Sequence, residues 1–264
     1  MATTIARAAK LFMALSLFTA TACSGAPDDG SMEDEAIGDD AAEVSTVALG
    51  VDTNGSTLDI DFARARGFKF VARYLSFDGA HPALTREEAA RFKTARVPLV
   101  SIWETGQERA VQTGSVHGQY LAGMADAKEA HARAVQVGAG SKPIYFTVDF
   151  NVTPQYWTSK TKDTSTGKPI ERRELILSYF QGINSVIGAN RTGAYGTYTT
   201  VKELFNAKRI TFGWQQTFAS RGDHVDPRAQ LRQYNIYPDQ TGWGVGGAGA
   251  LDYDRAVKQN YGQW

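Results

Sequence analysis

The chain has 264 residues, with 28 basic and 28 acidic side chains and therefore a formal net charge of zero at pH 7. This balance excludes the strongly basic composition that is typical of nucleic-acid-binding proteins. The single cysteine, Cys23, excludes an intrachain disulfide, and its position close to the N-terminus leaves the rest of the chain without a thiol for catalysis or metal binding.

Residues 1–22 have the pattern of a signal peptide. Arg7 and Lys10 precede an apolar run at 11–18, which is too short to span a membrane as a helix, and small residues follow up to Ala22. Cleavage before Cys23 would suit an ordinary signal peptidase, and the sequence there also resembles the site at which bacterial lipoproteins are lipidated. We expect an extracytoplasmic protein, either secreted and soluble or anchored to the cell envelope through a lipid on Cys23.

Residues 23–47 are predicted to form a disordered acidic linker. The stretch 24–50 holds eight Asp or Glu and no Lys or Arg, a composition that cannot bury enough apolar surface to fold. Without this stretch and the signal peptide, the chain keeps 26 basic and 20 acidic residues. A mildly basic domain suits an anionic cell wall as well as an ordinary soluble surface.

Residues 48–264 are predicted to form one domain in which short apolar runs alternate with helical patterns. Such alternation indicates a parallel sheet, and eight candidate strands favour a (β/α)8 TIM-like barrel over an open sheet. We expect a monomer. The strands are expected at 48–52, 68–76, 97–104, 144–150, 193–198, 210–217, 231–235 and 250–253, and the helices at 58–66, 85–95, 123–137, 171–187 and 201–207, with a last segment from 254.

Cofactor and metal motifs are not indicated. Gly242-x-Gly244-x-x-Gly247 matches a dinucleotide fingerprint formally, but no strand and helix flank it in a complete βαβ unit, so we interpret it as a loop. The chain has no Gly-x-Ser-x-Gly or His-Glu-x-x-His motif, and its four histidines are scattered. We therefore expect no cofactor and no metal.

The run at 144–150 is the most informative strand, because it ends beside a carboxylate. Alternation places Ile144, Phe146 and Val148 on one face, and Tyr145, Thr147 and Asp149 on the other, which should point into the barrel. About twenty residues, 151–170, are then expected to form a long loop, and loops of that length are often functional. Asp149 is accordingly a candidate catalytic residue.

Four of the predicted strands end in an acid, and parallel barrels hold their active sites at the carboxyl ends of the strands. Asp52, Glu104 and Asp149 are the candidate catalytic residues, with Asp252 as a candidate binding residue. Neighbouring strands lie about 4.8 Å apart, so their carboxyl groups could be about 5–9 Å apart, which suits both retaining and inverting glycosidases. Alternation groups Glu104 with Val100 and Ile102, and we expect a bulge or turn to bring it inward.

Aromatic and amide side chains near the same strand ends could bind a sugar. Flat rings suit the apolar faces of sugars, and Trp157, in the expected long loop, is the leading candidate for such a platform. Ordinary core packing is the alternative for many of these rings. The candidate substrate-binding residues are Asp252, Asn151, Trp157, Tyr195, Trp214, Gln216 and Gln233.

Together these pieces resemble a family of secreted bacterial glycoside-hydrolase-like barrel domains, long classed as of unknown function and related to the Ch-type lysozymes, or muramidases. The resemblance covers nearly all of the chain after Ala48. It implies a TIM-like barrel with a carbohydrate-binding cleft and the cell-wall polysaccharide peptidoglycan as the ligand class. Its segments are Gly50-Val51-Asp52, Phe70-Val71-Ala72-Arg73-Tyr74-Leu75, Trp103-Glu104, Ile144-Tyr145-Phe146-Thr147-Val148-Asp149, Gly193-Ala194-Tyr195-Gly196, Trp214-Gln215-Gln216-Thr217, Gln233-Tyr234 and Asp252-Tyr253-Asp254.

One position departs from the muramidase pattern. Those enzymes carry Asp-x-Glu at the end of the fourth strand, whereas this chain has Asp149-Phe150-Asn151. An amide cannot donate and recover a proton as a carboxyl group can. Two hypotheses follow: a metal-independent glycoside hydrolase in which Glu104 is the acid, or a non-catalytic domain that binds or scaffolds the wall.

Overall fold

The computed structural model describes residues 45–53, 55, 58–76, 82–216, 224–235 and 251–264. Its elements, in chain order, are β1 (Ala48–Thr53), α1 (Ile60–Ala65), β2 (Phe70–Tyr74), α2 (Arg86–Thr94), β3 (Leu99–Trp103), α3 (Val116–Val137), β4 (Ile144–Thr147), α4 (Pro154–Thr158), β5 (Lys160–Lys162), β6 (Pro169–Glu171), α5 (Arg172–Ile187), a 3-10 turn (Ala189–Arg191), β7 (Thr192–Gly196), α6 (Tyr198–Asn206), β8 (Phe212–Gln216), β9 (Leu231–Asn235) and β10 (Leu251–Ala256).

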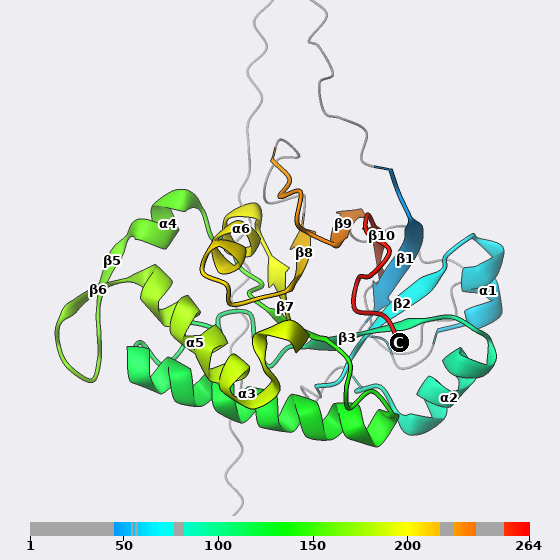
Figure 1. Cartoon of the computed structure of the whole chain (residues 1–264), viewed down its shortest axis with the longest axis horizontal. Coiled ribbons are helices and arrows are strands. Elements are labelled where there is room, and N and C mark those ends of the chain that lie inside the picture. The colour runs from blue at the N-terminus through cyan, green and yellow to red at the C-terminus, as the bar shows by residue number, and fades with distance from the viewer. Residues whose placement is uncertain (1–44, 54, 56–57, 77–81, 217–223, 236–250) are drawn as a thin grey trace, which may run out of the picture. The chain divides into compact units, whose positions relative to one another are not determined.

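Eight strands close into a barrel in the order β1-β10-β9-β8-β7-β4-β3-β2 (Figure 1). The predicted barrel is confirmed, and each of the eight predicted runs contributes one strand. The expectation of an all-parallel sheet is wrong for β10, which pairs antiparallel with both β1 and β9. An antiparallel neighbour needs no crossover helix, and the sequence between β9 and β10 is rich in glycine, a poor helix former.

Side chains of the strands alternate between the barrel interior and the layer beneath the helices. On β4, Ile144 and Phe146 pack in the outer layer, whereas Tyr145 packs inside with Trp214 and Phe70. The predicted division of this strand is therefore confirmed. Gly50 lies against these interior aromatic residues and has no room for a side chain, because an added Cβ would collide with the ring of Phe70.

The helices cover the outside of the barrel (Figure 1). α3 and α5 lie side by side, and their backbones approach closely at Gly123 and Gly182, where an added Cβ would meet the carbonyl oxygens of Tyr179 and Tyr120. α3 begins at Val116, earlier than predicted, because Ser115 caps it by accepting a hydrogen bond from the Gly118 backbone N–H.

The expected long loop at 151–170 contains structure that periodicity did not predict. Thr153 caps the short helix α4, in which Pro154 occupies the first turn, and an antiparallel hairpin of β5 and β6 follows. The Asp163 carboxylate accepts hydrogen bonds from the backbone N–H groups of Ser165 and Thr166 and so fixes the hairpin turn. These elements are only three to five residues long, too short to show a period.

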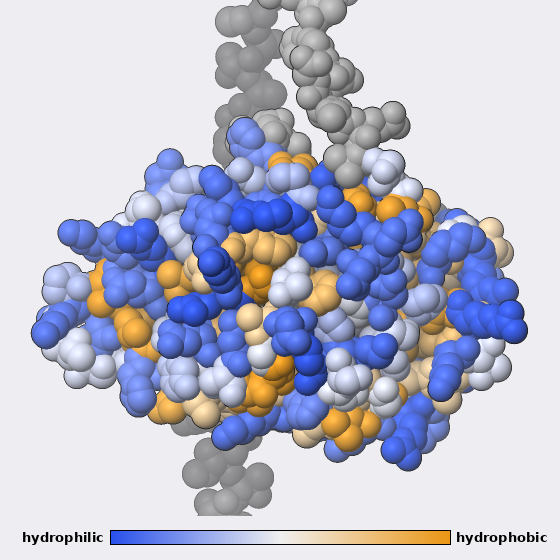
Figure 2. Space-filling model, in the orientation of Figure 1, coloured by the Kyte–Doolittle hydropathy of each residue, from blue (hydrophilic) through white to orange (hydrophobic). Residues whose placement is uncertain are grey.

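The face drawn in Figure 2 is mainly hydrophilic, with apolar side chains in small separated patches. Within the described ranges, no helix has both the length and the apolar character needed to cross a membrane.

Candidate active site

Three carboxyl groups meet where β1 pairs with β10. Asp52 lies directly opposite Asp252, and Asp254 lies opposite Gly50. We call the end of the barrel at which the parallel strands have their carboxyl ends the mouth. Because β10 is antiparallel, its first residues lie at this end, so Asp252 reaches the mouth although it is near the start of its strand. Asp52 is 6 % exposed and Asp254 is fully buried.

A hydrogen-bonded chain of side chains holds these acids. Tyr195, from β7, donates its hydroxyl hydrogen bond to Oε1 of Gln233 on β9 at 2.8 Å. The Gln233 amide nitrogen has two N–H groups, and it donates to Asp52 Oδ2 at 2.9 Å and to Asp252 Oδ2 at 3.1 Å. Gln233 thereby fixes the two carboxylates relative to each other.

Asp52 and Asp254 form a carboxyl pair that holds a proton. Burial, followed by the Asp252 charge, raises the pKa of Asp52 to about 8, against the hydrogen bonds from Gln233 and Asp254 that lower it. Burial and the Asp52 charge also raise the pKa of Asp254 well above its ordinary value. Trp214 Nε1 donates to Asp254 Oδ1 at 2.9 Å, whereas Asp254 Oδ2 is buried without a donor. A proton on this oxygen, directed at Asp52, would satisfy it, in line with the raised pKa of Asp254.

Tyr74 is a further residue of the site, for which no role was predicted from the sequence. It ends β2, and the charges of Asp52, Glu104 and Asp149 all raise its pKa, after burial as the largest cause. These three acids therefore lie within electrostatic range of one phenol. Tyr74 follows Phe70 and Ala72 on the inward face of β2, at the carboxyl end of the strand. This place in the alternation was the signal in the sequence that could have indicated its role.

Glu104 reaches the mouth by simple alternation, so the expected bulge or turn is not needed. Val100 and Ile102 point into the barrel, and the outer face of β3 is formed by Leu99 and Trp103. The sequence interpretation had the two faces of β3 reversed. The Glu104 backbone N–H donates to the Ser76 hydroxyl at 3.1 Å, which fixes the end of this strand beside β2.

Asp149 lies just after β4, on the strand next to that of Glu104. The backbone N–H of the preceding residue, Val148, donates to the Tyr195 carbonyl at 2.9 Å, and this bond extends the pairing of β4 with β7. Burial raises the pKa of Asp149. Among the residues that the structure describes, no group of three or more His, Cys, Asp or Glu side chains is arranged to hold a metal ion.

The family described as "Rv2525c-like, glycoside hydrolase-like domain" matches residues 61–257. The chain belongs to this family. The family resemblance found in the sequence is thereby confirmed.

Three comparisons show how far the similarity to known proteins extends. "Putative peptidoglycan hydrolase Rv2525c" of Mycobacterium tuberculosis (strain ATCC 25618 / H37Rv) is 28 % identical over 235 residues, covering 85 % of this chain and 88 % of that protein. The crystal structure of the M. tuberculosis Tat-secreted protein Rv2525c with L-tartrate has a TM-score of 0.68 at 23 % identity, covering 83 % of this chain and 100 % of the other. An uncharacterized B. stearothermophilus protein has a TM-score of 0.50 at 16 % identity, with coverages of 79 % and 95 %.

Two predicted sugar-binding tryptophans are core residues in this member of the Rv2525c-like family, and both expectations are corrected. Trp157 is 5 % exposed and packs in the layer between helices and barrel, because the segment around it forms α4. Trp214 is 1 % exposed inside the barrel, where its indole supports Asp254. Neither ring has a free face for a sugar.

The other predicted binding residues divide between two places. Tyr195 and Gln233 join the network of the acids, and Gln216 is buried at the end of β8, paired in register with Gln233. Asn151 is exposed and lines a separate cavity of about 440 Å³ with Tyr198 and His224. The predictions of a signal peptide at 1–22, of a lipid on Cys23, of most of the linker at 23–47 and of a loop at 242–247 fall on residues outside those described.

Proposed function

We propose that this chain is an exported glycoside hydrolase that acts on cell-wall glycan. The observation that carries the proposal is the pair Asp52 and Asp252, placed opposite each other and held by one Gln233 amide, in a setting where burial raises the pKa of Asp52. Membership of a glycoside-hydrolase-like family supports it, as do the name of the M. tuberculosis relative and the export of that protein. A signal peptide at 1–22, with Cys23 lipidated or not, fits the same location.

Glycosidic cleavage needs one protonated carboxyl group to protonate the leaving oxygen and one carboxylate on the other side of the sugar. We assign the proton donor to Asp52, because its environment favours the protonated form. Glu104 or Asp149 then supplies the carboxylate that stabilises the developing positive charge or activates water. This revises the assignment from sequence, in which Glu104 was the acid.

Gln233 and Tyr195 have a positioning role in this scheme. Gln233 holds Asp52 and Asp252 through its two N–H groups, and the Tyr195 hydroxyl fixes the orientation of that amide. Asp252, partly exposed, is the partner that raises the Asp52 pKa and can accept a hydrogen bond from a sugar hydroxyl. No metal or cofactor is assigned to the reaction.

The test is release of reducing ends from purified peptidoglycan by the wild type and by Asp52→Asn, Glu104→Gln and Asp149→Asn. We expect each substitution to lower the rate at least about 100-fold, the contribution typical of a general acid or base. Asp61→Asn, which removes an exposed carboxylate from α1, is the matched control and should leave the rate unchanged. Wild-type activity should fall as the pH rises through about 8, where Asp52 loses its proton.

If all three mouth variants are as active as Asp61→Asn, the assignment of the site is wrong. If the wild type releases no reducing ends from any glycan but sediments with peptidoglycan, the chain is a wall-binding protein instead. Asn151 favours this second function, because it stands where muramidases of the resembling pattern carry a glutamate. In that case Asn151→Glu tests whether the missing acid is the reason for the lack of hydrolysis. We then expect this variant to release reducing ends from the glycan that the wild type only binds.

A further inference from the structure

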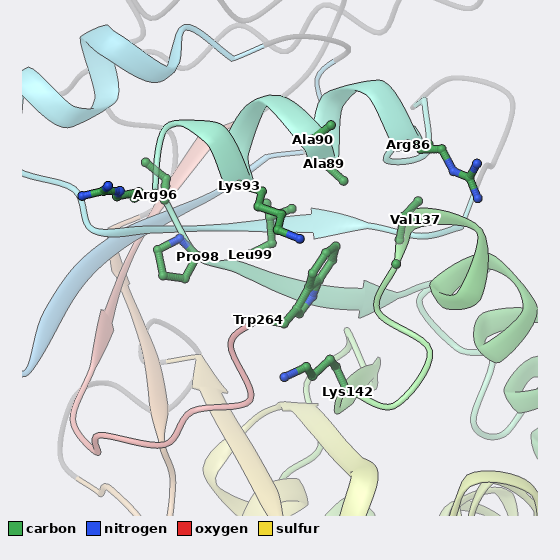
Figure 3. A pocket seen from close by; sticks show the side chains of 12 residues that line it. Arg86, Ala89, Ala90, Lys93, Arg96, Pro98, Leu99, Val137, Lys142 and Trp264 are labelled. Atoms are coloured by element: carbon green, nitrogen blue, oxygen red, sulfur yellow. The ribbon is translucent and has the colours of Figure 1, made fainter.

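A cavity of about 660 Å³ lies at the end of the barrel opposite the mouth (Figure 3). Its walls come from α2, from the residues that lead into β3 and β4, and from Trp264 near the end of the chain. These are the amino ends of the strands, so the cavity is separate from the acids of the proposed active site.

The charged side chains that line the cavity are all of one sign. Four cationic side chains line it, namely Arg86, Lys93, Arg96 and Lys142, and no carboxylate side chain belongs to the described lining. Within the described ranges, no ion pair engages Lys93, Arg96 or Lys142. The remaining walls are apolar and include Pro98.

Trp264 forms a fixed aromatic wall. Its backbone pairs with Leu99 through two hydrogen bonds, at 2.9 and 3.0 Å, and its indole N–H donates to the Ser101 hydroxyl at 3.0 Å. The polar edge of the ring is thereby satisfied by the protein, and the ring remains half-buried in the cavity wall. Figure 3 shows Lys93 extending from α2 toward this ring and Lys142 on the other side of Trp264, with Arg86 and Arg96 at the two ends.

We infer that this cavity binds an anionic saccharide, with a sugar ring against the Trp264 indole and a carboxylate or phosphate group between Lys93 and Lys142. A flat aromatic wall suits the apolar face of a sugar, and unpaired ammonium groups suit an anion at its edge. A neutral sugar would leave the cations without a partner, and a bare anion would leave the indole unused.

The consequence is a second attachment point for an acidic glycan on the side of the barrel away from the mouth. A protein that holds such a polymer at one end would keep it at high local concentration near the other end. The inference stands independently of hydrolysis, because none of the lining residues belongs to the proposed catalytic set.

Calorimetry with four small molecules tests the ligand class. Glucose 6-phosphate and glucuronate are acidic sugars that differ in their anionic group, whereas glucose and inorganic phosphate are half-probes, which carry only the sugar or only the anion. We expect one or both acidic sugars to bind at least about tenfold more tightly than either half-probe, and the binding to weaken with added salt, since the Debye length shortens. Equal binding of glucose would overturn the role of the cations, and equal binding of phosphate would overturn the role of Trp264.

Variants locate the site. Lys93→Gln/Lys142→Gln should weaken the acidic sugar at least about fivefold, whereas Lys160→Gln/Lys168→Gln, which removes the same charge from the exposed β5–β6 region, should not. Trp264→Ala should also weaken binding, with thermal unfolding measured in parallel to detect a loss of fold. Equal weakening by the two lysine pairs, or no binding of either acidic sugar, would overturn the inference while leaving the test at the mouth unaffected.

Discussion

The carboxyl group of Asp254 has no exposed surface, and the charge of Asp52 raises its pKa. A carboxyl group whose pKa is raised on folding favours the folded state in its protonated form. Its contribution to stability is complete below the ordinary value of 3.8 and is lost as the pH rises through the folded value, about 8 for Asp52. The free energy of unfolding should therefore fall between these pH values.

Asp254→Asn should reduce this loss. The amide cannot ionise, so the group whose pKa is raised by burial and by the Asp52 charge is removed, while its oxygen can still accept from Trp214 Nε1. We expect the fall in unfolding free energy from about pH 4 to about pH 8 to shrink by at least about 1 kcal/mol, measured by urea denaturation across that range. A wild-type stability that does not change over the range would contradict the shared proton.

Among single residues, the position of Asp149 could be predicted from the sequence, whereas those of Glu104 and Trp157 could not. The inward position of Asp149 followed from alternation, because Tyr145 and Thr147 are visibly more polar than Ile144 and Phe146. β3 gives no such contrast, since both of its faces are mainly apolar and its one polar residue, Ser101, lies on the outer face with Leu99. Trp157 was misjudged because burial depends on a short helix that has no periodic signal.

At the scale of elements, Arg73 joins β2 to α2 and to β1. Its guanidinium donates to the Glu88 carboxylate at 2.7 and 3.2 Å and to the Thr53 carbonyl at 2.7 Å, and it has no exposed surface. Because the ion pair is buried, removing one partner leaves the other charge without compensation. The strand and the helix are thereby tied at the end of the barrel that carries the acids.

Arg73→Met should lower the free energy of unfolding by about 3–5 kcal/mol, measured by urea denaturation. The double variant Arg73→Met/Glu88→Leu removes the stranded carboxylate, so it should be more stable than the single one, although the Thr53 carbonyl still loses its donor. Equal stability of the single and double variants would show that the pair is not the cause.

The contact of α3 with α5 depends on glycine. Helix propensity alone predicts that Gly182→Ala stabilises α5 by about 1 kcal/mol. We expect the opposite, a loss of about 1–3 kcal/mol, because the new methyl group would collide with the Tyr120 carbonyl oxygen. Thermal unfolding measures the change, with Gln181→Ala at the exposed neighbouring position as the control. A gain in both variants would contradict the close helix contact.

At the scale of the whole molecule, residues 261–264 close the end of the barrel opposite the mouth. Tyr261 packs inside with Phe70, at a ring-centroid distance of 4.9 Å, and its carbonyl accepts a hydrogen bond from the Tyr145 hydroxyl at 2.9 Å. Together with the backbone pairing of Trp264 and Leu99, these contacts join segments that are far apart in the sequence. The barrel interior is thus completed only when the end of the chain is in place.

Tyr261→Ala should therefore lower the free energy of unfolding by about 3–5 kcal/mol, the usual cost of removing a large buried ring. Tyr261→Phe keeps the ring and should cost less than about 1 kcal/mol. Urea denaturation compares the two, and a small effect of the alanine variant would mean that the ring does not fill the barrel.

The sequence by itself determined the eight strands, the closed barrel, the family and the inward set on β4, because hydrophobic periodicity and strand-end acids are local patterns. Only the tertiary structure decided the antiparallel direction of β10, the pairing of Asp52 with Asp254 and the placement of Tyr74 among the acids. Those features depend on contacts across the barrel between residues as much as 181 positions apart, as in the bond from Gln233 to Asp52. A pKa depends in turn on burial and on neighbouring charges, which exist only once the barrel has closed.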